Sequence, residues 1–265
     1  MDIQNHPIGV LDSGLGGISV LRELVRLMPE EDYLYFGDSK NAPYGTKTAE
    51  EVLRLTRNTV SFLLEQGSQA IVVACNTATS VAIRELRQEY PSIPMIGIEP
   101  ALKPAVEAKA HSTVLVMATP MTLKKEKLSD LMHRYESDAK IIKVPCPGLV
   151  ELIEGGVLEG PQMEAYLQKV FAGFGKEHMD AVVLGCTHFP LVKEEIRKAL
   201  PAEVKIYDGG AGTARETRRR LVAAGLRREQ KEKGRVIFYN SSEDEKMLEL
   251  SRYLLDKAGE EERKS

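Results

Sequence analysis

The chain has 265 residues and is 43% hydrophobic, which is enough to fill one large α/β domain or two of ordinary size. The net charge is −3 with both signs interspersed, so there is no basic field of the kind that binds nucleic acid. No apolar run approaches the ~20 residues that span a bilayer, and no basic and apolar leader opens the chain, so we expect a cytoplasmic protein without a membrane partner.

Short apolar or β-branched runs alternate with longer amphipathic stretches, a pattern typical of strand–helix units in parallel sheets. In chain order, the predicted strands are Ile8–Leu11, Tyr33–Phe36, Ala70–Ala74, Met95–Ile98, Thr113–Met117, Lys140–Val144, Ala181–Gly185, Val204–Tyr207 and Arg235–Tyr239. The clearest helical pattern, Thr48–Gly67, begins at a capping threonine and ends at a glycine. These features predict an α/β protein.

The first half of the chain recurs in the second half, about 110 residues later and in the same order. The paired segments are "IGVLDSG" with "VLVMATP", "YLYFGD" with "IIKVPC", "VVACNT" with "VVLGCTH", and "MIGIEP" with "KIYDGG". We therefore expect two similar parallel-sheet domains, related by pseudo-two-fold symmetry, with the active site in the cleft between them. The predicted domains are residues 1–98 with 209–265, whose C-terminal segment packs back on the first sheet, and residues 99–208.

Two of the three cysteines, Cys75 and Cys186, occupy equivalent places at the predicted carboxyl ends of strands, where α/β proteins bind ligands. A lone cysteine is usually a small buried hydrophobe, but the duplicated pair favours a functional role. Cys75 precedes Asn76 and Thr77 at the start of a predicted helix, where the helix dipole favours a thiolate. Cys186 appears in the same context, so both thiols are candidate acid/base groups.

His188 follows Cys186 by two residues and can exchange protons with it near neutral pH. The other four histidines are interpreted as surface or structural. In the first half, Asp12 is the matching candidate, because its strand-end position directs a carboxylate into the same cleft, where it can orient a thiol or raise its basicity. Cys146 lies between two prolines with no acid or base nearby, so we interpret it as structural.

The loops that follow the predicted strands supply further polar candidates. Ser13 and the glycines of "GLGGIS" form a possible nest for a substrate carboxylate, or only a tight turn. The segment "GDSKNAPYGTK" (37–47) is a polar loop on the same side of its sheet, a weak signal by itself. The second-half counterparts, each ambiguous alone, are Thr119, Thr122 and Glu154.

Three other kinds of site fit the sequence poorly. The glycine loop departs from the dinucleotide fingerprint at Ser19, which argues against a nicotinamide site. Zinc is disfavoured because neither a C-x-x-C nor an H-E-x-x-H spacing is present. A Cys–His hydrolase would use one cysteine and leave its twin without a role.

Four motifs, in this order, resemble the glutamate racemases of the cofactor-independent amino-acid racemase family. They are "DSGLGG" (12–17), "GDSKNAPYG" (37–45), "ACNTA" (74–78) and "LGCTHFPLV" (184–192). The resemblance implies interconversion of L- and D-glutamate without cofactor or metal, and a supply of D-glutamate for peptidoglycan. It also implies a homodimer. Some family members bind DNA gyrase, but this sequence has no signal for that interaction.

Residue by residue, the resemblance implies acid/base roles for Cys75 and Cys186, assisted by Asp12 and His188. It also implies that Cys75 deprotonates D-glutamate and that Cys186 deprotonates L-glutamate. The substrate-binding residues that it implies are Asp12, Ser13, Pro43, Tyr44, Gly45, Asn76, Thr77, Thr119, Thr122, Glu154, Thr187 and His188. The chain departs from the family at Met121, which stands where a glycine is usual. An aspartate or hydantoin racemase and a non-catalytic binding protein remain alternatives.

Overall fold

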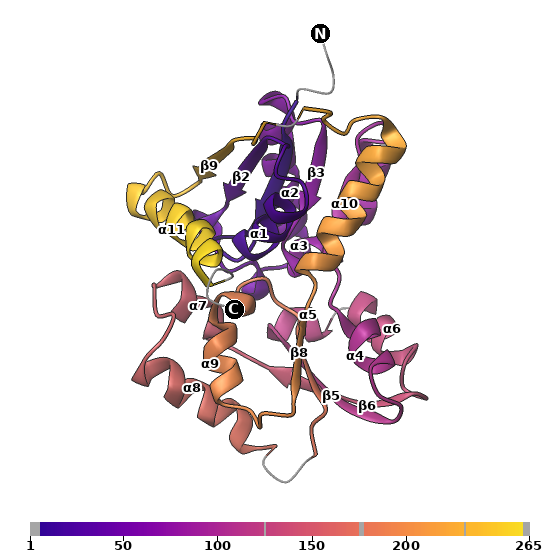
Figure 1. Ribbon diagram of the computed structural model, residues 1–265, viewed down its shortest axis with the longest axis vertical. Helices are drawn as coiled ribbons and strands as arrows, with labels where there is room; N and C mark the ends of the chain where they lie inside the picture. The colour runs from indigo at the N-terminus through magenta and orange to yellow at the C-terminus, as the bar shows by residue number, and fades with distance from the viewer. Residues whose placement is uncertain (1–5, 125, 175–177, 231, 262–265) are drawn as a thin grey trace. The chain divides into compact units, whose positions relative to one another are not determined.

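The computed structural model describes residues 6–124, 126–174, 178–230 and 232–261, and its chain divides into two compact units (Figure 1). Unit 1 comprises Met1–Glu99 with Gly210–Ser265, and unit 2 comprises Pro100–Gly209. Each unit contains one sheet, and all strand pairs in the described residues are parallel. The predicted class, two parallel-sheet α/β units, is therefore confirmed.

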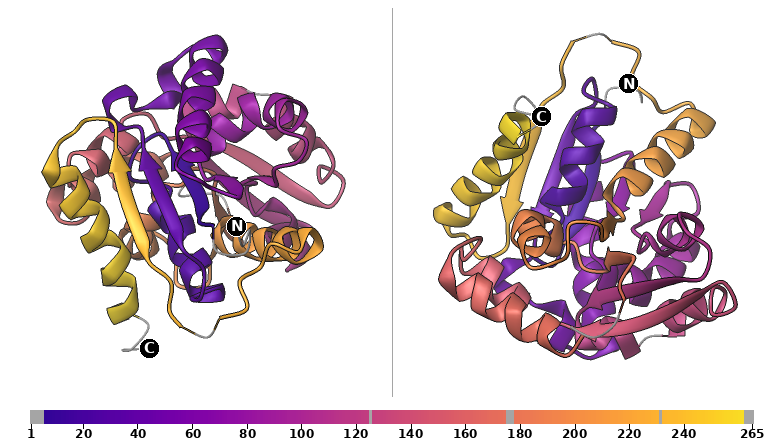
Figure 2. Two further views of the ribbon diagram at one scale, coloured as in Figure 1. Left: turned by 90° about the horizontal axis from the view of Figure 1, so that it is seen from above. Right: turned by 60° about the horizontal axis from the view of Figure 1, so that its bottom comes forward.

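Unit 1 has a five-stranded sheet in the order β4-β3-β1-β2-β9. Its strands are β1 (Ile8–Asp12), β2 (Tyr33–Gly37), β3 (Ala70–Val73), β4 (Met95–Gly97) and β9 (Val236–Asn240). Its helices are α1 (Ile18–Leu27), η2 (Ser39–Asn41), η3 (Tyr44–Thr46), α2 (Ala49–Glu65), α3 (Asn76–Glu89), α10 (Gly210–Ala224) and α11 (Glu245–Glu261). Helix α1 packs against α10 and α11, while α2 packs against α3, so helices cover both faces of this sheet (Figure 2).

Burial explains why the inner strands of unit 1 read as continuous apolar runs. Every residue of β1 and β3 is buried, as expected for strands covered on both faces, whereas the edge strand β9 is partly exposed. Helix α2 begins where the sequence predicts, with a reciprocal capping box between Thr48 and Glu51. Its C-terminal glycine, Gly67, has φ +88°, a conformation that glycine adopts readily.

Unit 2 has a four-stranded sheet in the order β6-β5-β7-β8. Its strands are β5 (Ser112–Ala118), β6 (Ala139–Pro145), β7 (Ala181–Leu184) and β8 (Lys205–Asp208). Its helices are α4 (Leu102–Glu107), α5 (Pro120–Lys124), α6 (Glu126–His133), α7 (Leu149–Glu154), α8 (Pro161–Ala172), η4 (Phe189–Val192) and α9 (Lys193–Lys198). Alternate residues of β5 enter two cores, because Leu115 and Met117 pack with α7 and α8, while Val114 and Val116 pack with α4 and α6.

The two sheets share one strand order, β4-β3-β1-β2 in unit 1 and β8-β7-β5-β6 in unit 2. The tandem repeat predicted from the sequence is therefore present in the topology, and β9 is an addition to the first copy. All nine predicted strands lie in the described residues, and no strand end is shifted by more than one residue. No helix among these residues is long and apolar enough to cross a membrane.

Candidate active site

The candidate residues form two groups, one in each unit, and each group follows the carboxyl ends of parallel strands. In unit 1, Asp12 ends β1 and Cys75 follows β3, which pairs with β1. In unit 2, Thr119 follows β5 and Cys186 follows β7, which pairs with β5. Neighbouring parallel strands end at the same edge of a sheet, so each group is assembled by the strand order.

Cys75 is buried and forms the N-cap of α3. Its sulfur accepts a hydrogen bond from the backbone N–H of Ala78 at 3.4 Å, and its S–H donates to Ser13 Oγ at 3.6 Å. The backbone donors and dipole of a helix N-terminus favour negative charge on such a sulfur. The pairing with Ser13 brings the loop after β1 to the thiol, as the sequence predicts.

The loop after β1 is organised around the buried Asp12 carboxylate, which accepts the backbone N–H of Gly14 at 3.0 Å. Gly17 must be a glycine here, because a Cβ would lie 2.6 Å from the Cβ of Asp12. The glycines therefore let the backbone pack closely beside the carboxylate.

The loop after β2 is held by a carboxylate that the sequence analysis did not single out. Asp38 is buried, and its Oδ2 accepts the Tyr44 hydroxyl at 2.6 Å while Asn41 Nδ2 donates to Oδ1 at 2.9 Å. Burial, followed by the charge of Asp38, raises the pKa of Tyr44, and the charges of Cys75 and Asp12 act in the same direction. Asp38 follows β2 directly, and the strand-end rule that selected Asp12 could have found it.

The neighbours of Tyr44 in the motif, Pro43 and Gly45, are both half-buried. Pro43 follows a cis peptide bond and is the N-cap of η3, the short helix that contains Tyr44 and Gly45. The structure therefore places all three predicted residues of this loop in one ordered turn.

Asn76 and Thr77 open α3 directly after Cys75, and both are buried. Among the described residues, Asn76 Oδ1 is a buried acceptor without a hydrogen-bond partner. A buried amide oxygen of this kind carries a desolvation cost that a donor from a ligand can relieve.

In unit 2, Cys186, His188 and Glu154 form a hydrogen-bonded series. His188 Nδ1 lies 3.8 Å from Cys186 Sγ, and its Nε2 lies 2.5 Å from Glu154 Oε1. Burial lowers the pKa of the His188 imidazole, whereas the hydrogen bonds and charges of Cys186 and Glu154 raise it. The raising effects together are larger than the effect of burial, so the net pKa lies well above 6.5. The series can therefore hold an imidazolium between a thiolate and a carboxylate.

The two cysteines differ in their local setting, contrary to the expectation of equivalent helix starts. Cys75 caps the long helix α3, whereas Cys186 precedes a turn and the short helix η4, whose N-cap is His188. Pro190 stands in the first turn of η4, and α9 begins only at Lys193. At Cys186, therefore, the histidine takes the place of a helix N-terminus beside the sulfur.

The remaining predicted residues of unit 2 are also buried, including Thr187. Thr119 Oγ1 and Thr122 Oγ1 lie 2.9 Å apart, and the backbone N–H of Thr122 donates to Thr119 Oγ1 at 3.3 Å. These hydrogen bonds between the two threonines stabilise the first turn of α5. Met121, in the position where the family has a glycine, lies between them and is half-buried.

Cys146 has the features of a structural thiol. It is buried in the same core cluster as Cys186, and its S–H donates to the carbonyl of Val144 at 3.4 Å. Burial, and secondarily the charge of Cys186, raises the pKa of Cys146 to about 12. At neutral pH this thiol therefore stays protonated and unreactive.

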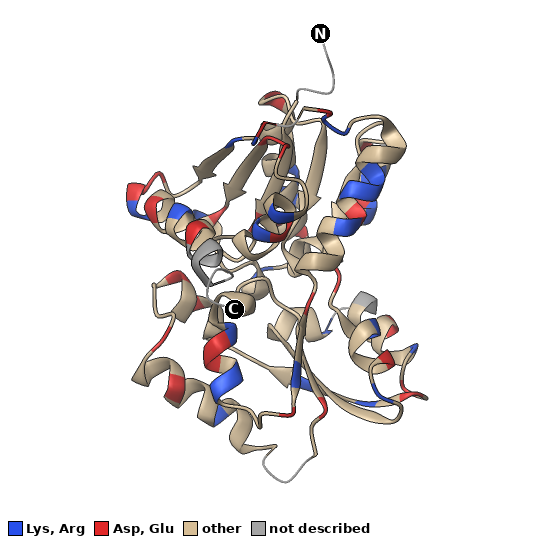
Figure 3. Ribbon diagram, in the orientation of Figure 1, with Lys and Arg blue, Asp and Glu red and all other residues tan. Residues whose placement is uncertain are grey.

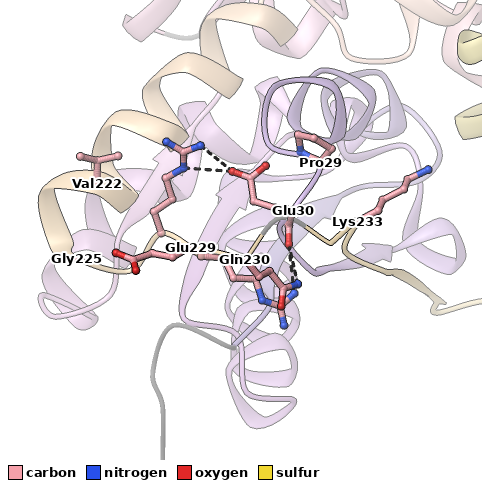
Figure 4. Close-up of a pocket in the computed structure, with 9 residues that line it drawn as sticks. Pro29, Glu30, Val222, Gly225, Glu229, Gln230 and Lys233 are labelled. Carbon is pink, nitrogen blue, oxygen red and sulfur yellow. Dashed lines mark hydrogen bonds and ion pairs between the residues drawn. The ribbon is translucent and has the colours of Figure 1, made fainter.

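The described residues contain no group of three or more His, Cys, Asp or Glu side chains placed to hold a metal ion. A surface hollow of about 860 Å³ in unit 1 contains none of the candidate residues (Figure 4). Two of its charged side chains pair with each other, Arg227 with Glu30 at 2.8 Å. The residues that line it are Pro29, Glu30, Val222, Gly225, Arg227, Arg228, Glu229, Gln230 and Lys233.

Charge is interspersed along the ribbon, and the densest positive stretch lies on α10 (Figure 3). There Glu216 pairs with Arg219 and Arg220, each at 2.7 Å. The candidate residues themselves are mostly buried and carry thiols, carboxylates and hydroxyls, so the chemistry they offer is proton transfer and recognition of small polar groups.

Comparison with known proteins gives one consistent result. The family model described as Asp/Glu/Hydantoin racemase matches residues 8–217. The glutamate racemase of Clostridium acetobutylicum is 53% identical over 256 residues, which cover 97% of this chain and 100% of that protein. The structure of glutamate racemase from Francisella tularensis in complex with D-glutamate matches with a TM-score of 0.82 and 30% identity, covering 96% of this chain and 94% of that one.

A second solved structure gives the same match. The Escherichia coli glutamate racemase in complex with L-glutamate and the activator UDP-MurNAc-ala has a TM-score of 0.83 and 29% identity, and the match covers 94% of this chain and 95% of that one. Both sequence and fold thus agree with these relatives over nearly the whole chain. The chain belongs to the aspartate/glutamate/hydantoin racemase family.

Proposed function

We propose that this chain interconverts L- and D-glutamate by transferring protons through two thiols, without a cofactor. The observation that carries the proposal is the duplicated placement of Cys75 and Cys186, each two residues after the end of the third strand of a repeated sheet. Relatives named glutamate racemase at about 50% identity over nearly the whole chain support glutamate as the substrate.

Racemisation removes a proton from one face of the α-carbon and delivers another to the opposite face. We assign these two steps to Cys75 and Cys186, one acting as thiolate and the other as thiol. After the reaction their protonation states are exchanged, so the same pair serves the reverse direction. A turnover of about 10 per second would correspond to a barrier of ~16 kcal/mol, which is demanding for a weak carbon acid.

The neighbours of each thiol support this assignment. The backbone N–H of Ala78 and the N-terminus of α3 stabilise a thiolate at Cys75, and Asp12 immediately precedes Ser13, which contacts this sulfur. His188, held by Glu154, stabilises a thiolate at Cys186 and can return its proton. The two thiols thus have different partners for the same task.

Substrate binding is assigned to the polar groups that surround the thiols. We propose that the substrate ammonium donates to Asn76 Oδ1, whose buried oxygen has no partner among the described residues. Hydroxyl and backbone donors would hold the carboxylates and stabilise the negative charge that develops when the α-proton leaves. The donors assigned to this role belong to Ser13, Tyr44, Gly45, Thr77, Thr119, Thr122 and Thr187. Pro43 has no N–H to donate, and its assigned role is to shape the turn that presents Tyr44 and Gly45.

The test is circular dichroism of L-glutamate incubated with the purified protein, with a chelator and no added cofactor. The ellipticity is expected to decay to zero with the wild type, and to persist with Cys75→Ala and with Cys186→Ala. Cys146→Ala is the matched control, since it removes a buried thiol whose pKa of about 12 keeps it protonated, and it should retain nearly full turnover. Rapid racemisation by either of the first two variants would remove that thiol from the mechanism.

Aspartate is the second candidate substrate, because the matching family model covers aspartate, glutamate and hydantoin racemases. The same optical assay with L-aspartate and with a hydantoin separates the three. A protein that binds glutamate without changing its ellipticity would instead be a non-catalytic member of the family.

We also propose, from the family resemblance, a cytoplasmic homodimer that supplies D-glutamate for peptidoglycan. Light scattering of the purified protein tests the dimer. Growth of a bacterium that depends on added D-glutamate tests the cellular role, because expression of an active racemase should remove that requirement.

A further inference from the structure

We propose that Tyr35 is a positioning residue for Cys75, acting through the carbonyl of Gly14. The proposal rests on the proposed role of Cys75 in racemisation. Tyr35 lies in the middle of β2 and is fully buried. Its hydroxyl donates to Gly14 O at 2.6 Å, across 21 residues of chain. The tyrosine therefore reaches directly into the loop that adjoins the thiol.

Gly14 stands next to the groups that surround Cys75. Its N–H donates to the Asp12 carboxylate at 3.0 Å, and the preceding residue, Ser13, accepts the S–H of Cys75 at 3.6 Å. The hydrogen bond from Tyr35 thus holds Gly14 in place. Gly14 in turn orients the Asp12 carboxylate and is the next residue after Ser13, whose hydroxyl contacts the Cys75 sulfur. Movement of Gly14 would shift both of these groups relative to Cys75.

Close packing leaves this loop little alternative space. A Cβ at Gly17 would lie 3.1 Å from the Tyr35 hydroxyl oxygen, and a Cβ at Gly37 would lie 2.7 Å from Gly14 O. The Tyr35 hydroxyl therefore approaches the loop where no side chain fits. Losing it would deprive a buried carbonyl of a donor, which favours movement of the loop toward another partner.

The ring of Tyr35 packs on Phe238 of β9, with centroids 5.8 Å apart and planes inclined at 57°. Strand β9 belongs to the C-terminal segment and pairs with β2, placing Phe238 opposite Tyr35 in the register. The aromatic contact restricts the ring, so the C-terminal strand contributes to the position of the hydroxyl. Strand β9 is thus linked, through Tyr35, to the loop after β1 that contacts Cys75.

Tyr33 provides a matched control on the same strand and the same face. It is equally buried, and its hydroxyl donates to the carbonyls of Leu24 at 3.0 Å and Met28 at 2.9 Å, at the end of α1. Tyr33→Phe removes an equivalent buried hydroxyl that does not bond to the loop of Gly14. Any effect that separates the two variants therefore comes from the Gly14 bond and not from the loss of a buried hydroxyl.

The experiment compares wild type, Tyr35→Phe and Tyr33→Phe in three measurements: kcat for glutamate racemisation, urea unfolding, and iodoacetamide alkylation of each cysteine followed by mass spectrometry. Tyr35→Phe should lower kcat about 10-fold or more, because small displacements of catalytic groups are costly. It should also change the alkylation rate of Cys75 about threefold or more through the altered sulfur environment, with Cys186 unchanged as the internal reference. Tyr33→Phe should lower the free energy of unfolding but keep the wild-type kcat and the wild-type alkylation rates of both cysteines.

Phe238→Leu serves as a milder second variant, and it should change the Cys75 rate in the same direction as Tyr35→Phe. The proposal is overturned if Tyr35→Phe keeps the wild-type kcat and the wild-type ratio of Cys75 to Cys186 alkylation, or if Tyr33→Phe alters both to the same extent. A wild-type protein that fails to racemise glutamate would refute the proposed function, whereas the alkylation ratio would still decide the positioning role.

Discussion

At the scale of single residues, the two thiols differ in what lies beside them, and His188 is the clearest difference. Its imidazole has a pKa well above 6.5 because the hydrogen bonds to Cys186 and Glu154 outweigh the effect of burial. We predict that Glu154→Gln lowers this pKa, since the variant keeps the shape of the side chain and removes its negative charge. The measurement is an NMR titration of the His188 imidazole, with the midpoint expected at lower pH in the variant.

Glu151→Gln is the control, because Glu151 lies one turn earlier on α7 and is exposed. In the Glu151→Gln variant, the His188 titration should match the wild type, and an equal shift in both variants would contradict a specific role for Glu154.

The dependence of stability on pH follows from the raised pKa of His188 in the folded state. The stabilisation by His188 is fully present below about pH 6.5 and is lost as the pH rises through the folded pKa, and Glu154→Gln should diminish it.

At the scale of the elements, α2 shows how a local signal sets a boundary. The Thr48 side chain accepts the N–H of Glu51 at 3.2 Å, and the Glu51 carboxylate accepts the N–H of Thr48 at 3.2 Å. We predict that Thr48→Ala lowers the free energy of unfolding by about 1 kcal/mol through loss of the cap, with kcat unchanged. Urea denaturation measures the loss, and Thr48→Ser, which keeps the hydroxyl, should recover most of it. A serine variant as unstable as the alanine variant would show that the hydroxyl is not the stabilising group.

At the scale of the whole molecule, the proposed reaction needs one thiol from each repeated sheet. In deuterated water, the first product molecules should carry deuterium at the α-carbon, while the unreacted substrate stays protiated. The reason is that the thiolate which removes the proton differs from the thiol that delivers the solvent-derived deuteron. Mass spectrometry of the early turnovers makes the measurement, and a product that mainly retains the substrate's own hydrogen would exclude the two-thiol mechanism in favour of a single base.

Much of this architecture was predictable because its signals are local in sequence. Apolar runs bounded by polar turns located all nine strands, and four paired segments about 110 residues apart predicted two similar sheets. The rule that neighbouring parallel strands end at the same edge of a sheet predicts that Asp12 and Cys75 lie close together. The family followed from four motifs that the comparisons then supported.

The sequence by itself therefore determined the class of fold, the repeat and most of the candidate residues, since periodicity and turn chemistry act over a few positions. Only the tertiary structure decided which side chains bond to one another. Tyr35 reaches Gly14 across 21 residues, and His188 reaches Glu154 across 34. Such contacts depend on strand register and on the exact path of loops, and no local pattern encodes either one. For the same reason Asp38 gained its importance from the buried hydroxyl of Tyr44 that it accepts, a partnership that only the folded loop creates.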